Sequence, residues 1–208
     1  MDHKHQDQIT KIKRLKALAD TGLIYSSEPY DLERYEQIKE ISLQLMADVI
    51  NEPLESVLGF YKPQKDYPTP KVDVRCLVIN EHEEILLVKE KIDGKWTIPG
   101  GWADIGYTAS EVAMKEVKEE TGLEIEVDRL LAIYDKKCHP HPPQPHYVYK
   151  IVFLGEILRG ELSKSHDILD VAFFPVDQLP ELSEDRILES QIKELVELSK
   201  SEVGVVFD

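Results

Sequence analysis

The sequence predicts an α/β protein, an α/β/α sandwich in which a mixed sheet lies between helices, preceded by a small N-terminal helical domain. Residues 1–62 carry apolar side chains at helical spacing, whereas from residue 71 onward short apolar runs alternate with turns, as strands do. Helical segments near residues 108–122 and 184–200 interrupt and follow those runs. This alternation of strands and helices favours a sheet covered by helices.

The first 62 residues predict two or three helices. The first is marked by apolar residues at helical spacing, and Gly22 is expected to end it: Ile9, Ile12, Leu15 and Leu18. A second helix is expected over residues 29–51 and a short third one after Pro53. So few helices bury too little apolar surface to be stable alone. We therefore expect them to pack on the rest of the chain or on a second subunit.

A proline-rich segment separates the helices from the strands. Three prolines fall within residues 62–70, which predicts an extended linker and sets the expected domains at 1–62, 63–70 (linker) and 71–208. After the linker, alternating apolar runs predict a hairpin from residues 72–79 and 84–90. Further elements are expected in this order: strands at 96–99, 124–135, 147–158 and 171–175, then a helix at 184–200.

Composition narrows the range of functions. The net charge of −15 argues against binding to a long nucleic acid or to an anionic membrane, since both require a basic surface. No apolar run approaches the roughly 20 residues that span a bilayer. The N-terminal residues lack the apolar core of a secretory signal, and the two cysteines suggest free thiols in a reducing compartment. We therefore expect a cytoplasmic protein.

The most informative segment is an acidic run on the helix at 108–122. Glu116, Glu119 and Glu120 stand at i, i+3 and i+4, so they share one helix face although like charges repel there. The helix is preceded by the turn Gly100-Gly101, whose backbone can approach a ligand closely. Thr108 and Glu111 have the form of a capping box, and Gly122 that of a C-cap. A hard divalent cation with oxygen ligands, most simply Mg²⁺, would offset the repulsion.

These residues resemble the Nudix hydrolase family, whose box reads G-x5-E-x7-R-E-U-x-E-E-x-G-U, with U a bulky aliphatic residue. The matching positions are Gly101, Glu116, Val117, Glu119, Glu120, Gly122 and Leu123. Tyr107 replaces the family's Glu and Lys115 its Arg, two residues that commonly pair. Both have changed together, which leaves no orphaned partner charge. We interpret the segment as a variant box that retains its function.

The resemblance implies a function for each matching residue. It assigns the metal ligands to the carboxylates of Glu116, Glu119 and Glu120 and to the backbone of Gly101. It assigns catalytic roles to Glu116 and Glu119, with Lys115 as their cationic neighbour. The implied cofactor is Mg²⁺, with Mn²⁺ as the alternative. The general base stays open between a glutamate of the box and a downstream loop aspartate, Asp167 or Asp170.

The N-terminal helices carry a second resemblance. Residues 17–25 and 30–36 look like the helical domain of a bacterial Nudix subgroup, whose members resemble pyrophosphatases of CDP-choline and ADP-ribose and commonly form homodimers. The implied reaction is Mg²⁺-dependent hydrolysis of the pyrophosphate bond in a nucleoside diphosphate linked to a second group, giving a nucleoside monophosphate and the phosphorylated group. The subgroup tilts the expectation slightly towards CDP-alcohols. The alternatives are processing of RNA ends or nucleotides, and a non-catalytic ligand sensor.

Substrate contacts are expected mainly from the loop between the two long strands. Residues 138–146 form a stiff loop rich in proline and histidine. The loop suggests a specificity loop, with zinc binding, plain packing or a dimer contact as alternatives. The candidate contacts are Lys136, Lys137, His139 and Tyr149, together with Arg75 from the first strand and Trp96 before the glycine turn.

Overall fold

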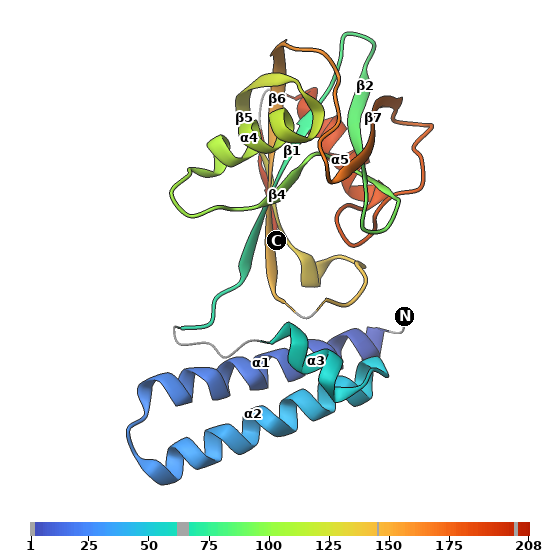
Figure 1. Ribbon diagram of the computed structural model, residues 1–208. Coiled ribbons are helices and arrows are strands. Elements are labelled where there is room, and N and C mark those ends of the chain that lie inside the picture. Colours follow the sequence, from blue (N-terminus) through green and yellow to red (C-terminus); the bar gives the residue numbers. More distant parts are fainter. Residues whose placement is uncertain (1–2, 62–66, 145, 202–203) are drawn as a thin grey trace. The chain divides into compact units, whose positions relative to one another are not determined.

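The computed structural model (Figure 1) describes residues 3–61, 67–144, 146–201 and 204–208. The chain forms two compact units. The helical unit comprises Met1–Pro70 together with Pro143–Tyr147, and the sheet unit comprises Lys71–Pro142 and Val148–Asp208. Of the predicted linker, residues 63–66 lie outside the described residues.

The helical unit contains three helices, α1 (His3–Tyr25), α2 (Pro29–Ile50) and α3 (Leu54–Phe60). The predicted second helix is confirmed, and Asn51 ends it in the left-handed conformation. The prediction that Gly22 ends the first helix is wrong, because α1 continues to Tyr25. The reason is tertiary packing: a Cβ atom at Gly22 would lie 2.5 Å from the ring of Tyr35, so glycine lets α2 approach α1 closely.

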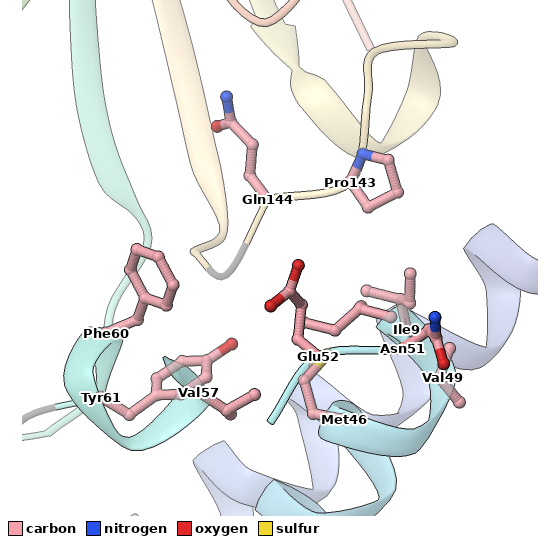
Figure 2. Close-up of a pocket in the computed structure, with 11 residues that line it drawn as sticks. Ile9, Met46, Val49, Asn51, Glu52, Val57, Phe60, Tyr61, Pro143 and Gln144 are labelled. Carbon is pink, nitrogen blue, oxygen red and sulfur yellow. The ribbon is translucent and has the colours of Figure 1, made fainter. Parts of the chain in front are cut away.

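Apolar side chains from all three helices form the core of this unit: Ile9, Ile12, Leu43, Met46, Ala47 and Val57. Beside it lies a pocket of about 470 Å³ with mainly apolar walls, to which Pro143 and Gln144 contribute. Figure 2 shows the carboxylate of Glu52 between Tyr61 and Ile9 in this pocket. Glu52 is the single acidic residue among its described lining residues, so the pocket does not resemble the acidic run on residues 116–120.

The sheet unit contains two sheets. The first has the strand order β4-β1-β6-β5-β8, in which β1 runs parallel to β6 and antiparallel to β4. The second has the order β3-β2-β7. The strands are β1 (Lys71–Val78), β2 (Glu84–Glu90), β3 (Trp96–Thr97), β4 (Gly100–Trp102), β5 (Glu124–Asp135), β6 (Val148–Arg159), β7 (Ile168–Pro175) and β8 (Val206–Phe207).

The predicted hairpin does not form as expected, because β1 and β2 belong to different sheets. Both edges of β1 are already paired, one with β4 and the other with β6. β2 pairs instead with β3 and β7, and a single bridge between Ile79 and Ile85 joins the ends of the two strands. Strands β4 and β8 are too short for the sequence pattern to indicate them.

Two helices cover the opposite faces of the larger sheet (Figure 1), α4 (Ala109–Thr121) and α5 (Glu189–Ser199). Alternate residues of β1 point to opposite faces, so Cys76 packs in the cluster of α4 and Leu77 in the cluster of α5. The predicted α/β fold with a mixed sheet is confirmed. No helix in the described part of the chain combines the length and apolar character needed to span a membrane.

The close approach at Gly22 leads to a stability prediction. We expect Gly22→Ala to lower the free energy of unfolding by about 1–3 kcal/mol, because the new methyl group overpacks the contact with Tyr35. The matched control is Gly59→Ala in α3, where a Cβ atom meets nothing within 4 Å. There alanine should stabilise by up to about 1 kcal/mol through helix propensity. Urea unfolding of both variants measures the difference; equal effects would contradict the packing argument.

Candidate active site

The predicted turn Gly100-Gly101, for which we keep the name glycine turn, forms the start of strand β4 and lies against β1 and α4. Gly100 has a φ of +143°, and a Cβ atom there would lie 2.1 Å from the carbonyl oxygen of Val74. A Cβ atom at Gly101 would lie 2.8 Å from Oε2 of Glu116. The first glycine is therefore required by the strand pairing, and the second makes room for a carboxylate.

Helix α4 begins and ends at the predicted caps, which fix the position of its acidic residues. The hydroxyl of Thr108 accepts a hydrogen bond from the amide of Glu111, whose carboxylate accepts one from the amide of Thr108. Gly122 ends the helix with a φ of 77°. Buried Val112, Ala113 and Val117 hold the opposite face of the helix in the core.

Glu120 is bound to the glycine turn. Its Oε2 atom accepts a hydrogen bond from the amide of Gly100 at 2.9 Å. Burial raises the pKa of Glu120 to about 7, against the opposing influence of Arg75 and of this hydrogen bond. A buried carboxylate of this kind is stabilised when a cation binds beside it.

Glu116 and Glu119 have different environments. The side chain of Glu116 is mostly buried next to Gly101, and burial raises its pKa against the attraction of Lys115. The side chain of Glu119 is 58% exposed. Glu116 thus joins Glu120 beside the turn, while Glu119 faces solvent one helical turn away from Glu116.

Lys115 connects the carboxylates of the box. Its Nζ atom lies 3.5 Å from Glu116 and 3.4 Å from Glu119, and it donates to Asp104 at 3.2 Å. These anions, Asp104 first, raise the pKa of Lys115. The same Nζ atom lies 5.9 Å from the ring centroid of Tyr107, a cation–π distance. The two residues that depart from the Nudix box therefore contact each other, and Asp104 supplies a carboxylate partner for Lys115.

The chemistry of these residues fits a divalent cation. In the described part of the chain no three histidine, cysteine or acidic side chains gather closely enough to hold a metal by themselves. Glu116 and Glu120, however, both lie against the Gly100-Gly101 backbone, and both offer the hard oxygen ligands that Mg²⁺ prefers. Two carboxylates and a backbone carbonyl form an incomplete set that leaves room for substrate oxygens.

A profile of the NUDIX domain matches residues 69–195, which is more than half of the chain. The chain belongs to the Nudix hydrolase family. A second profile, described as a UDP-X-like N-terminal oligomerisation domain, matches residues 6–61. The family confirms the predicted hydrolase of pyrophosphate bonds, and Nudix hydrolases generally use divalent metal ions.

Relatives match over nearly the whole chain. The Bacillus subtilis protein YjhB, provisionally named an ADP-ribose pyrophosphatase, is 40% identical over 96% of both chains. A solved structure of a UDP-X diphosphatase is 34% identical, covers 98% of this chain and 99% of its own, and superposes with a TM-score of 0.64. An ADP-ribose pyrophosphatase structure from Streptococcus suis is 38% identical over 67% of this chain and 100% of its own, with a TM-score of 0.61.

Two of the predicted substrate contacts of this Nudix protein lie inside the sheet unit. Arg75 is buried, and its guanidinium donates to Asp73 at 3.0 Å and to the carbonyl of Ile98 at 3.1 Å. Lys136 is also buried and donates to the carbonyl of Asp185. Burial, together with the charge of Lys150, lowers the pKa of Lys136 to about 7. The structure brings Arg75 and Lys136 into one buried charged cluster.

The other predicted contacts are spread over the sheet unit. Trp96 packs edge-to-face on Phe174, with ring centroids 4.8 Å apart. Lys137 pairs with Asp135 at 3.0 Å, and His139 contacts Asp208 at 3.0 Å. Tyr149 is exposed on β6. Trp96 therefore lies in the smaller sheet, apart from the residues that flank β5 and β6.

The two loop aspartates considered as general base lie at the start of β7. The side chain of Asp167 is 84% exposed and pairs with the ring of His166 at 2.9 Å. Asp170 is exposed within β7 and accepts a hydrogen bond from the amide of Val171. Neither has a described contact with the carboxylates of α4.

Sequence reasoning missed Asp73 and Lys150. Lys150 donates to Asp73 across neighbouring strands, and Arg75 contacts the same carboxylate. Burial alone would raise the pKa of Asp73, but these two cations outweigh it and hold the pKa at about 2. Burial lowers the pKa of Lys150 to about 8. The available signal was Asp73 and Arg75 at i, i+2 in an otherwise apolar strand, which puts both charges on one face.

The contact between Gly101 and Glu116 leads to a prediction about activity. In Gly101→Ala the new methyl group displaces a flexible carboxylate, so the fold should remain intact. A misplacement of about 1 Å at a reacting site lowers the rate by about 100-fold, and we expect a loss of pyrophosphate hydrolysis of that order. Steady-state kinetics and thermal unfolding together check this. Unchanged activity would contradict the close contact between Gly101 and Glu116. Loss of the fold would contradict the expectation that the carboxylate moves aside.

Proposed function

We propose that this Nudix protein hydrolyses the pyrophosphate bond of a nucleoside diphosphate linked to a second group, with Mg²⁺ or Mn²⁺ as cofactor. Glu116, Glu120 and the backbone of Gly101 hold the cation, and Glu119 contacts it through water. The observation that carries the proposal is the placement of two partly buried carboxylates against the Gly100-Gly101 turn. Bound there, a divalent ion would screen the negative charge of the diphosphate and acidify a water molecule.

Two further residues of α4 have separate roles in the proposed reaction. Glu119, exposed and next to Lys115, accepts the proton of the attacking water. The water oxygen forms a bond to one phosphorus as the bridging P–O bond breaks, which gives a nucleoside monophosphate and a phosphorylated second group. Lys115, in the middle of α4, pairs with both Asp104 and Glu116 and so links the helix to the segment that follows β4.

Within this class we propose ADP-ribose as the leading substrate. Support comes from two relatives: YjhB matches over 96% of this chain and the Streptococcus suis structure over 67% of it, and ADP-ribose is in the name of both. The UDP-X diphosphatase likewise acts on a linked nucleoside diphosphate by its name. CDP-choline, which the N-terminal resemblance favoured, stays a prediction to be compared directly.

A substrate panel tests this function. We expect metal-dependent release of a monophosphate from ADP-ribose, UDP-linked sugars or CDP-choline well above that from nucleoside triphosphates or a short RNA. Glu120→Gln should abolish turnover by at least about 100-fold, because it removes a cation ligand. In metal-free buffer the same change should preserve or raise the free energy of unfolding, since it removes a buried charge.

Unchanged turnover in Glu120→Gln would refute the assignment of Glu120 as a metal ligand. Metal binding by the wild-type chain without turnover of any substrate would favour the sensor alternative.

We further propose that the N-terminal helical domain, residues 1–62, mediates a homodimer of catalytic domains spanning 71–208. Its profile is that of an oligomerisation domain. Five large apolar side chains at helical spacing on α1 and α2 are exposed in one chain: Leu15, Leu18, Ile38, Ile41 and Leu45. A second copy would cover them. The cytoplasmic location also stays a prediction.

The dimer proposal predicts which substitutions produce monomers. Leu18→Glu and Ile41→Glu place charges on side chains that are each 58% exposed, and we expect both variants to elute as monomers in size-exclusion chromatography with light scattering. The control is Leu158→Glu on β6, where the side chain is 61% exposed. It should leave the mass unchanged. Dimers in both helical variants would contradict the proposal.

A further inference from the structure

Three charged side chains lie buried beside the glycine turn, and neither the proposed metal site nor the proposed mechanism uses them. Asp73, Arg75 and Lys150 are between 0% and 6% exposed. Asp73 and Lys150 are register partners on the parallel strands β1 and β6, and their side chains form an ion pair. All three side chains are therefore largely inaccessible to solvent.

Arg75 contacts both this ion pair and the residues of the glycine turn. Its Nε atom donates to Asp73 at 3.0 Å, and its Nη1 atom donates to the carbonyl of Ile98, two residues before Gly100. Arg75 is also the register partner of Gly100 in the pairing of β1 with β4. A Cβ atom at Gly100 would lie 2.9 Å from Cδ of Arg75, so the arginine stem supports the turn directly.

The glycine turn contacts Glu120, a candidate metal ligand. The amide of Gly100 donates to Oε2 of Glu120 at 2.9 Å, and Glu120 and Glu90 both attract the guanidinium of Arg75. A continuous set of contacts therefore runs from Lys150 through Asp73 and Arg75 to Gly100 and Glu120. Lys150 lies at the far end of this set, outside the segment that matches the Nudix box.

Stability alone does not explain why the charges are there. Well-packed apolar residues often replace a buried ion pair without loss of stability, since desolvation offsets the attraction between the charges. Leu77, which lies on the same face of β1 as Asp73 and Arg75, packs in an apolar cluster, so apolar residues would suit this face. Charged groups instead fix the orientation of a side chain, because several directional hydrogen bonds hold the guanidinium of an arginine in one position.

We propose that Lys150 is a positioning residue for metal binding: through Asp73 it holds Arg75 under Gly100 and thereby fixes the carboxylate of Glu120. This inference rests on the proposed metal site. Partners that orient the ligands of a metal typically change its affinity by about 10- to 100-fold when they are replaced.

The sign of the effect separates positioning from simple electrostatics. Lys150 is a cation, so removing its charge would tighten the binding of a divalent cation if charge alone mattered. Loss of positioning has the opposite effect, because Arg75 and the turn lose their support. Lys150→Met should therefore weaken metal binding, and Lys150→Arg, which keeps the partner of Asp73, should largely restore it.

The experiment is a calorimetric titration of the substrate-free full chain with Mn²⁺ and Mg²⁺, alongside kinetics at varied metal concentration. We expect Lys150→Met to raise both the dissociation constant and the metal concentration for half-maximal activity about 10- to 100-fold. Asp73→Asn and the double variant should show a similar factor, since all three interrupt the same contacts. The double variant also removes both charges of the pair, so it keeps the test available if Lys150→Met folds poorly.

The matched control is Lys16→Met in α1. Lys16 forms a comparable buried pair with Asp20 at 2.5 Å, but in the helical unit. The Lys16→Met variant should leave the metal affinity unchanged. Unchanged or tighter binding in folded Lys150→Met, or multiplicative effects in the double variant, would overturn the inference. If the wild-type chain binds metal but hydrolyses no linked diphosphate, the proposed function fails while the titration still decides the role of Lys150.

Discussion

The hydrogen bond from the amide of Gly100 to the carboxylate of Glu120 joins a strand to a helix, and the candidate site depends on it. It forms because Gly100 adopts a φ of +143° that places its backbone against β1, where a side chain would collide with the carbonyl of Val74. The turn can then face α4, whose position is set independently by its capping box and its buried face. Two locally determined elements thus meet at one bond.

Around this bond the protein concentrates charges of both signs. Glu116 and Glu120 are partly buried, whereas Arg75 and its partner Asp73 are fully buried. Each group would be unfavourable alone in an apolar interior, and each has a partner of opposite charge or a backbone donor. Such an arrangement keeps carboxylates ready for a cation while limiting their mutual repulsion.

The local parts of this site follow from sequence, whereas its long-range parts do not. The caps at Thr108 and Gly122 and the face shared by the three glutamates depend only on residues within one helix, and sequence predicted them. The separation of β1 from β2 depends on competition with β4 and β6, which no local pattern records. Lys150 and Asp73 are 77 residues apart, so their pairing requires the parallel register of the finished sheet. Gly22 failed as a helix end for the same reason, since Tyr35 of the next helix determines its role.

The segment Pro143–Tyr147 belongs to the helical unit, although the residues before and after it in the sequence belong to the sheet unit. It leaves the sheet unit after Pro142 and returns at Val148, yet its contacts lie with the helices. The hydroxyl of Tyr147 donates to the carbonyl of Thr10, and Lys13 donates to the carbonyl of His146. The helical unit is therefore not a detachable module. Removal of only the first 70 residues would leave this loop without its partners, so an experiment that isolates the sheet unit has to deal with residues 143–147 as well.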